Sequence, residues 1–596
     1  APNAQRNLLV LSLVLMLPGL NTGLAADDYL QAIILRGSHV LDGFDRPRLD
    51  IFRFCDSHLS PGFLRVGIFT WWDDPTTKLA FFRPVSALTH WLDYTLWPDS
   101  PWLMHLHCLV WGAVLLFAVR AIFRQLVPDR FVATLAFALY ALDDARAWIV
   151  SWVASRNGVV ASALSLWAFY LYCRGRAGTR AAAWLAPAVL AAGLLAGEGA
   201  VSVYAFIFAH ALFLESGSLR TRLLRLWPYA VLLVAWRVGY RALGYGVSGS
   251  GLYVDPTTDP VTYAARWLER APVLLFAQIG GPWSDAWSPM FVFPKLRAVL
   301  YAGAWTALAC VVAQVAPLAR RSEQAPLVRF GLLVAFLSTF PACTVFIADR
   351  LLPWVAVGAC LVLAIWLAPI LQAAAAGVTT NDSWLKRTIA LALVSANLVM
   401  APCLIPSRAR GNVALSDVLD RSELGTPKDA SIEDKLLVYV NAPAVPLAAY
   451  TPITRAALGI PRAKAQRILA TSTTPMRIAR VDERTLRLSP RGGFLQDPGS
   501  WLMWTPRRPF SSGEQIPVGE TTYIVRAVTE DHRPLVVDAR FDRPLEDRSI
   551  LFRQWLGSHY EDFTPPALGR EVLLPGADYM QVVFGVKLPV EARLDP

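Results

Sequence analysis

Long apolar runs, separated by short charged stretches, dominate the first two thirds of the chain. The first run, residues 8–26, carries no charged side chain. As a helix rising about 1.5 Å per residue, it is just long enough to cross a bilayer. Further runs follow at 101–119, 131–142, 158–173, 182–197, 199–214, 226–243, 268–283, 298–318, 327–347, 351–372 and 388–405. The pattern predicts a bundle of transmembrane helices over residues 1–405.

The pattern changes after residue 405. Short runs at 435–441, 476–488, 521–528 and 535–541 resemble strands, and several alternate apolar with charged residues. Glycines and prolines between them mark turns. We therefore expect residues 406–596 to form a soluble, mostly β domain with a few helices, one of them at 549–556. No catalytic or metal-binding motif in this region indicates its role.

Composition agrees with a membrane protein that crosses the bilayer several times. Hydrophobic residues make up 55% of the 596 residues and charged residues only 17%, with a mean hydropathy of +0.40. The net charge of +11 comes mainly from arginine, whose planar guanidinium binds phosphate bidentately. No basic stretch interleaved with aromatics lies in a soluble segment, which argues against nucleic acid as a partner.

The seven cysteines are scattered without CxxC or His/Cys ligand spacing. This arrangement predicts neither a disulfide framework nor a structural zinc site. The sequence identifies no particular cofactor. A divalent metal stays possible, but no residue pattern indicates one.

Basic clusters set the expected orientation. If Arg6 lies in the cytoplasm and each apolar run crosses the membrane, the basic clusters at 120–130, 174–180 and 220–225 are also cytoplasmic. The clusters at 320–321 and 386–387 are cytoplasmic only if the run at 268–283 does not cross the membrane fully. The positive-inside rule then favours about eleven crossings, with the segments 27–100 and 406–596 on the outer face of a bacterial-type inner membrane. Alternatively, Arg6, the apolar core and the small residues at 23–26 resemble a signal peptide that is cleaved.

Two aspartates, Asp27 and Asp28, directly follow the first apolar run. A carboxylate at a membrane boundary can serve as a base on a lipid-linked substrate. The simpler alternative is that both aspartates end the helix and are solvated. Residues 29–100 contain no long apolar run, so we expect one long outer loop that carries acidic and arginine residues, and loops of this length are uncommon unless functional.

Further ionisable residues gather at the same predicted face of the membrane. The arginines lie in three motifs: Arg83 in R-P-x-S, Arg156 in W-x-x-x-R-N and Arg350 in R-x-x-P. The others are His105 near the start of a helix, the acidic pair Asp143 and Asp144, and Glu198 at a hairpin tip. Because ionisable groups at membrane depth are costly, they usually face a cavity. Five of them also have a plain structural alternative: ion pairing for the arginines at 83 and 350, snorkelling for that at 156, solvation for the glutamate and packing for the histidine.

The order of these motifs over about residues 8–370 resembles the GT-C-type integral-membrane glycosyltransferases, in particular the protein O-mannosyltransferase-like branch. The resemblance implies a GT-C-like bundle and a sugar donor on a polyprenyl phosphate. It also implies that Asp27 is the general base, with Asp28 as its support. The implied donor phosphate-binding residues are Arg83, Arg156 and Arg350, and the supporting residues are Glu198, Asp143, Asp144 and His105. No metal ligand is implied.

The leading hypothesis is therefore a membrane glycosyltransferase that moves a sugar, a hexose or pentose, from a lipid-phosphate donor to an unknown protein, glycan or lipid acceptor on the outer face. A second hypothesis is a non-catalytic GT-C-like protein that anchors the outer β domain for envelope assembly or binding. A third is a transporter or flippase. It is disfavoured because the charges lie at helix ends rather than near the middle of the membrane.

Overall fold

The computed structural model describes residues 3–37, 41, 44, 46–378, 383–578 and 581–582. The chain forms two compact units, each with its own core. The first, here called the helical unit, contains Ala1–Gly23, Phe81–Tyr245 and Asp255–Asn412. The second, the mixed unit, contains Leu24–Ala80, Gly246–Val254 and Val413–Pro596.

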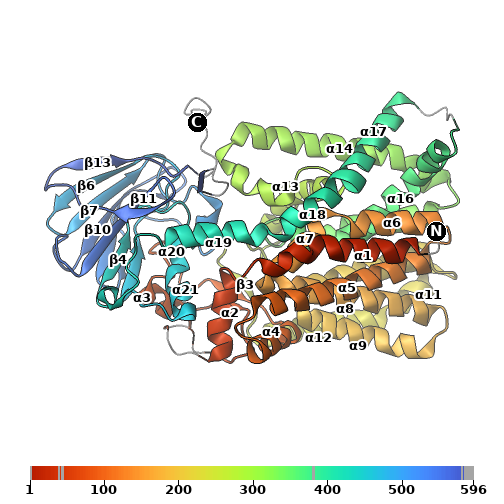
Figure 1. Ribbon diagram of the computed structural model, residues 1–596, viewed down its shortest axis with the longest axis horizontal. Helices are drawn as coiled ribbons and strands as arrows, with labels where there is room; N and C mark the ends of the chain where they lie inside the picture. The colour runs from red at the N-terminus through yellow and green to blue at the C-terminus, as the bar shows by residue number, and fades with distance from the viewer. Residues whose placement is uncertain are drawn as a thin grey trace. The chain divides into compact units, whose positions relative to one another are not determined.

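Helices build the helical unit, and most of them follow predicted apolar runs (Figure 1). They are α1 (Ala4–Met16), α4 (Pro84–Leu96), α5 (Pro101–Leu126), α6 (Arg130–Ala141), α7 (Ala147–Ser151), α8 (Arg156–Arg176), α9 (Arg180–Ala196), α10 (Val203–Phe213), α11 (Leu219–Leu224), α12 (Trp227–Ala242), α13 (Pro260–Gln278), α14 (Pro294–Arg321), α15 (Ala325–Ala342), α16 (Pro353–Ala375), α17 (Trp384–Val394) and α18 (Ala401–Ala409). Several begin with proline at the first turn, where its missing N–H costs nothing.

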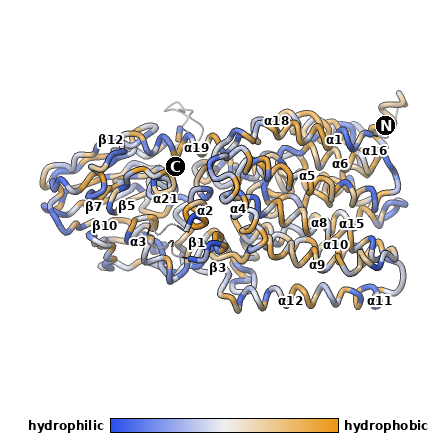
Figure 2. Tube along the Cα trace, turned by 60° about the horizontal axis from the view of Figure 1, so that its bottom comes forward, coloured by the Kyte–Doolittle hydropathy of each residue, from blue (hydrophilic) through white to orange (hydrophobic). Residues whose placement is uncertain are grey.

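Five helical segments in the described part of the chain are long and apolar enough to cross a membrane: Pro101–Leu126, Pro294–Arg321, Ala325–Ala342, Pro353–Ala375 and Trp384–Ser422. Figure 2 shows long hydrophobic stretches along the helices of this unit. The chain is an integral membrane protein. The predicted fold class, a helical membrane bundle with a C-terminal β-sheet domain, is confirmed, and the number of crossings stays a prediction.

The first apolar run does not form the single helix expected over residues 8–26. Helix α1 ends at Met16, and a 3-10 helix continues from Leu17 to Asn21. Pro18 and Gly19 start this tighter turn, and a Cβ on Gly19 would lie 3.0 Å from the carbonyl oxygen of Ala409. The missing side chain therefore lets α18 approach closely, and this contact ends the regular helix.

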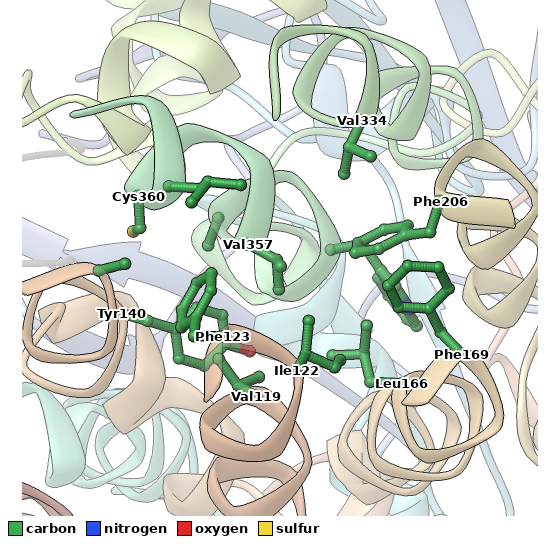
Figure 3. Packing of buried hydrophobic residues seen from close by; sticks show 14 of the residues in the cluster. Val119, Ile122, Phe123, Tyr140, Leu166, Phe169, Phe206, Val334, Val357 and Cys360 are labelled. Atoms are coloured by element: carbon green, nitrogen blue, oxygen red, sulfur yellow. The ribbon is translucent and has the colours of Figure 1, made fainter. Parts of the chain in front are cut away.

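The core of the helical unit lies between α5, α6, α8, α10, α15 and α16. In Figure 3, side chains of these helices point toward one another, among them Phe123, Tyr140, Phe169 and Phe206. Helix α16 is the most enclosed of the five membrane candidates, with 83% of its apolar window buried. Gly358 on α16 lets it meet α15, because a Cβ there would lie 2.4 Å from the carbonyl oxygen of Gly331.

The mixed unit contains three sheets (Figure 1). The six-stranded antiparallel sheet has the order β13-β6-β7-β10-β9-β8, with bounds Glu571–Leu574, Met476–Asp482, Thr485–Pro490, Pro534–Phe541, Thr521–Val528 and Gln515–Val518. The four-stranded sheet has the order β12-β11-β4-β5, with bounds His559–Asp562, Ile550–Leu556, Leu436–Tyr439 and Ala465–Ile468, and β4 runs parallel to both of its neighbours. The smallest sheet joins β1 (Arg53–Cys55), β2 (Lys78–Ala80) and β3 (Gly246–Ser248).

Two local predictions are wrong. The expected helix at 549–556 is strand β11, because its residues pair in register with β4. Residues 29–100 are not one loop: they contain most of α2 (Asp27–Arg36), α3 (Ser60–Val66), α4 and two short strands.

The mixed unit also includes α19 (Gly411–Ser422) from Val413 onward, α20 (Pro446–Ala449) and α21 (Thr451–Leu458). That residues 1–405 and 406–596 are two separately folding domains stays a prediction.

Trp71 joins the early segment of the mixed unit to its β-sheet core. Only 2% of this residue is exposed. Its ring stacks on Tyr523 at 5.1 Å between centroids and meets Phe494 edge-on at 5.5 Å. Its indole N–H donates to the carbonyl oxygen of Leu469 at 3.0 Å. Residues 24–80 therefore complete the core that the C-terminal strands build.

We predict that Trp71→Ala destabilises the mixed unit by about 3–5 kcal/mol, since it leaves a cavity among aromatic rings. Thermal unfolding of the purified full chain, with limited proteolysis to identify the unit that opens first, measures the effect. Trp184→Ala is the matched control because 82% of Trp184 is exposed. Equal unfolding midpoints for the two variants would contradict the prediction.

Candidate active site

A strained turn leads into the predicted base. Ala26, directly before α2, has φ 50° and ψ −113°, the geometry of the first central position of a type II′ turn, where glycine is normally required. Such a conformation costs about 1–3 kcal/mol and persists only where its surroundings impose it. Asp28 holds the turn: its Oδ2 accepts from the N–H of Ala25 at 2.9 Å, and its own N–H donates to the carbonyl oxygen of Ala25 at 3.1 Å.

The two aspartates differ in exposure. Asp28 is 0% exposed and is committed to the turn, whereas Asp27 is partly exposed at the first position of α2. A carboxylate at a helix N-terminus is stabilised by the helix dipole. The geometry thus gives Asp28 a structural role, and Asp27 is the more exposed carboxylate of the two.

Tyr450, at the junction of α20 and α21, contacts Asp27 within the mixed unit. Its hydroxyl donates to Oδ1 of Asp27. Burial, and then the neighbouring Asp27 carboxylate, raises the pKa of Tyr450 well above its usual value. The hydroxyl therefore stays protonated and remains a donor. No sequence signal indicated this residue.

In the helical unit, Arg83 and Glu198 form an ion pair with each other. The guanidinium Nη2 lies 2.7 Å from Oε2 of Glu198, and Nε donates to the same oxygen at 2.8 Å. Tyr240 donates to Oε1 at 3.0 Å. Glu198, expected at a hairpin tip as a supporting residue, is therefore the partner of the R-P-x-S arginine.

Arg156 is completely buried among polar partners. It is 0% exposed and is ion-paired through Nη2 with Asp93. It donates to the Met104 and Thr89 carbonyl oxygens at 2.9 and 3.2 Å, and to the sulfur of Cys108 at 3.2 Å. Since these contacts use the guanidinium on every side, they fit a structural role for Arg156 and leave no approach for a donor phosphate.

His107 completes this buried network. Its Nδ1 lies 2.7 Å from Oδ1 of Asp93, and its Nε2 lies 3.1 Å from the indole nitrogen of Trp111. Because the indole can only donate, Nε2 must accept, so a neutral His107 carries its proton on Nδ1. Asp93 thus bonds to both a guanidinium and an imidazole.

His105, expected to support the site, fixes the end of the N-terminal segment. The ring is 0% exposed. Its Nε2 lies 2.8 Å from the carbonyl oxygen of Gly23 and 3.1 Å from the hydroxyl of Thr22, and Nδ1 lies 3.1 Å from the carbonyl oxygen of Val150. These contacts describe a packed, structural histidine.

Asp143 and Asp144 belong to two separate networks. Asp143 accepts from Gln278 at 2.9 Å and lies 3.4 Å from the guanidinium of Arg146. Asp144 pairs with Arg408 at 2.8 Å.

Arg408 also lies 2.8 Å from Asp349 and 3.0 Å from Asp285, so three carboxylates surround one guanidinium. Asp349 accepts in addition from the N–H and hydroxyl of Ser284 at 2.8 and 2.6 Å. Within the described ranges no group of three or more His, Cys, Asp or Glu side chains is arranged to hold a metal ion. The acidic cluster is built around arginine, not around a cation site.

Arg350 lacks the carboxylate partner that its neighbour Asp349 suggested. Its guanidinium lies over the rings of Phe346 and Trp152, at 5.3 and 5.5 Å from their centroids, and donates to the hydroxyl of Ser155 at 3.2 Å. Among the residues that the structure describes, it makes no ion pair. Of the three predicted phosphate-binding arginines, it is therefore the one without an ion pair in the described part of the chain, although Asp285 acts on it at longer range.

The sequence named candidate residues but not the partners that they have in the fold, and their roles stay predictions. It missed Asp93, Tyr240, Asp285 and Arg408 as well as Tyr450. Tyr240 lies within a predicted apolar run and Arg408 just after one, and none of the five lies in a motif. The structure joins Arg83 to Glu198 and Asp144 to Asp349, and it places Arg156 and His105 in separate buried networks.

Comparison with known proteins gave structural matches alone. No family model matches the chain, and no curated protein does. The archaeal oligosaccharyltransferase AglB from Archaeoglobus fulgidus, solved with an inhibitory peptide and a dolichol-phosphate, matches at 11% identity and a TM-score of 0.39, over 77% of this chain and 64% of that chain. ArnT from Cupriavidus metallidurans, bound to undecaprenyl phosphate, matches at 13% identity and a TM-score of 0.37, over 79% of this chain and 90% of that chain.

Both proteins are GT-C-type membrane glycosyltransferases, the class that the sequence resembles. The chain spans a little under two thirds of the length of AglB. The TM-scores lie below 0.5, so we argue the function from the chain's own residues.

The two arginines at 156 and 350 provide a direct test of this geometry. We predict that Arg156→Ala lowers the free energy of unfolding by about 3–5 kcal/mol, because it leaves the carboxylate of Asp93 buried without its ion pair. Arg350→Ala should cost about 1 kcal/mol or less, since it removes only stacking and one hydrogen bond. Thermal unfolding in the same detergent checks both. A stable Arg156→Ala protein would contradict the structural assignment.

Proposed function

We propose that the protein is a membrane glycosyltransferase that moves a sugar from a polyprenyl-phosphate-linked donor to an acceptor on the outer face of a bacterial-type inner membrane, with Asp27 as the general base. The observation that carries the proposal is the division of roles between two adjacent aspartates. One is buried and holds a strained turn, and the other is partly exposed at the start of a helix. Strain of this kind is usually found at functional sites.

The reaction needs two things from the protein. As the acceptor hydroxyl attacks the anomeric carbon, its proton passes to the Asp27 carboxylate and the bond between that carbon and the phosphate oxygen breaks. The sugar moves to the acceptor oxygen, and the polyprenyl phosphate leaves with the electron pair. Positive charge that binds this phosphate stabilises it as it leaves, so no general acid is required.

Arg350 is the best-supported phosphate-binding residue. Its guanidinium is held by two rings and a hydroxyl, and it has no ion pair in the described part of the chain. Arg83 already shares its charge with Glu198, so we assign it a secondary role in orienting the donor. Arg156 is left out of the proposed phosphate site because it is fully buried.

Asp143, Asp144 and Glu198 are proposed to act indirectly. Each carboxylate bonds to a neighbouring arginine or amide and so holds the loops at one end of the helical unit in place. His105 does the same for residues 22–23. The hydrophobic surfaces between helices would accommodate the polyprenyl chain.

A second function has some support. Arg156 is fully buried and Arg83 is ion-paired, so two of the three predicted phosphate-binding arginines serve internal contacts. This favours the alternative of a non-catalytic relative that anchors the C-terminal β domain for envelope assembly or binding. Transfer activity, and its dependence on Asp27, separates the two functions.

We predict that Asp27→Asn lowers sugar transfer by about 10²–10⁴-fold, the usual cost of losing a general base. Expression, membrane insertion and donor binding should stay close to wild type. The assay uses purified protein, radiolabelled polyprenyl-phosphate hexoses and pentoses, and membranes as the source of acceptor. An Asp27→Asn protein with wild-type transfer would remove the base from this proposal, and a wild-type protein without transfer would favour the anchoring function.

We predict that Arg350→Ala weakens binding of a radiolabelled polyprenyl phosphate by about tenfold or more, because it removes a charge-assisted hydrogen bond to phosphate. Arg320→Ala is the control, since Arg320 is an exposed arginine at the C-terminal end of α14. Equal affinities for the two variants would exclude Arg350 from the donor site.

A further inference from the structure

The C-terminal region contributes directly to the surroundings of the predicted base. Within the mixed unit, helix α2 packs against α21, and Tyr450 lies at the N-terminal end of that helix. We propose that Tyr450 is a positioning residue for Asp27, which makes the C-terminal domain part of the catalytic machinery and not only an appended binding module. The inference rests on the proposed role of Asp27 as the base.

The backbone around Tyr450 is fixed on both sides. Its N–H donates to the carbonyl oxygen of Pro446 at 3.2 Å, and its carbonyl oxygen accepts from Thr454 at 2.8 Å. The neighbouring Ala448 carbonyl oxygen accepts from Gln466 of β5 at 2.8 Å. The backbone that carries the phenol is thus fixed by α20 and α21, and α20 in turn is bonded to β5.

The Tyr450 hydroxyl bears on the side chain of Asp27. As the first residue of α2, Asp27 follows a turn that Asp28 locks, so its backbone is fixed, and rotation about its side-chain bonds sets where the carboxylate oxygens point. A hydrogen bond from the Tyr450 hydroxyl to Oδ1 restricts that rotation and orients the other oxygen. A correctly oriented carboxylate takes a proton faster than one that samples several orientations.

The same hydrogen bond favours the ionised form of the carboxylate, which is the form that acts as a base. Among the described residues, Asp28 and Tyr253 act electrostatically on Tyr450, and Asp28 and Asp420 of α19 act on the neighbouring Tyr29. Arg455 on α21 is engaged with Glu423 at 2.7 Å. All of these groups remain when Tyr450 is replaced by phenylalanine, so the substitution isolates the hydroxyl.

A first experiment tests the contact without needing activity. A water-soluble carbodiimide with an amine nucleophile modifies protonated carboxyl groups, and mass spectrometry of the full chain follows modification of Asp27 over a pH series. In Tyr450→Phe, the carboxylate loses a hydrogen bond that stabilises its charge. We expect the midpoint of modification to move to higher pH by about one unit.

Tyr560→Phe is the matched control. Tyr560 is a buried tyrosine of β12 whose hydroxyl has no hydrogen-bond partner among the described residues. Its replacement should leave the Asp27 midpoint unchanged. If Tyr450→Phe and Tyr560→Phe give the same midpoint as wild type, the inference is overturned, whatever the activity of the protein.

A second experiment tests the catalytic consequence with the radiolabelled donors described above. We expect Tyr450→Phe to lower kcat by about tenfold while the KM for the donor stays unchanged, and to move the acidic limb of the pH–rate profile upward. In an Asp27→Asn background the same substitution should have no further effect, because the hydroxyl acts through the carboxylate.

The two proposals fail in different ways. Wild-type transfer by Asp27→Asn would end the role of Asp27 as base, while the modification midpoint would still decide whether Tyr450 governs that carboxylate. In the opposite case, Asp27→Asn loses transfer while Tyr450→Phe keeps its kcat and pH profile. That result would support Asp27 as the base and overturn the inference about Tyr450.

Discussion

The helical unit depends on one constraint: an ionised side chain enclosed by apolar helices must find its opposite charge inside the protein. Asp93 and Arg156 meet this constraint at 0% exposure, and the carbonyl oxygens around the guanidinium absorb its remaining N–H groups. Because these groups come from α4, α5 and α8, the ion pair fixes how three helices approach one another at one end of the unit. Arg408 likewise fixes three connecting segments, because its guanidinium pairs with Asp144, Asp285 and Asp349.

The mixed unit meets a different constraint: Ala26 has a positive φ, a backbone conformation that alanine disfavours. The strained Ala26 is tolerated because Asp28 closes the turn with two hydrogen bonds and gives up its own exposure to do so. Its neighbour Asp27 is then placed by the turn and by a phenol that is more than four hundred residues away along the chain. The cost of the turn is offset within the same unit, where Trp71 anchors the early segment to the sheets.

Hydrophobic periodicity predicted the elements well wherever local pattern and tertiary packing agree. The apolar runs at 101–119 and 351–372 mark α5 and α16, and residues 521–528 coincide with β9. The pattern failed at residues 8–26, where Pro18 and Gly19 shorten the helix, and at 549–556, where pairing with β4 decides the structure. The same division holds for the site. Motifs named Asp27, Arg83 and Glu198 as candidates, whose roles stay predictions. An ion pair between residues 115 positions apart leaves no local signal, and neither does the contact from Tyr450.

A motif therefore reports which charges are present, whereas the fold decides which of them are already neutralised. Arg83, Arg156 and Arg350 look equivalent in the sequence. Two of them have carboxylate partners in the folded chain, and their positive charge is balanced at close range. The third lies on aromatic rings, which attract a cation but do not neutralise it. In the described part of the chain, Arg350 makes no ion pair and interacts with Asp285 only at longer range, so its guanidinium keeps much of its attraction for an anion. For this reason the lack of an ion pair among the described residues, more than the R-x-x-P motif, makes Arg350 the residue on which donor binding is expected to depend.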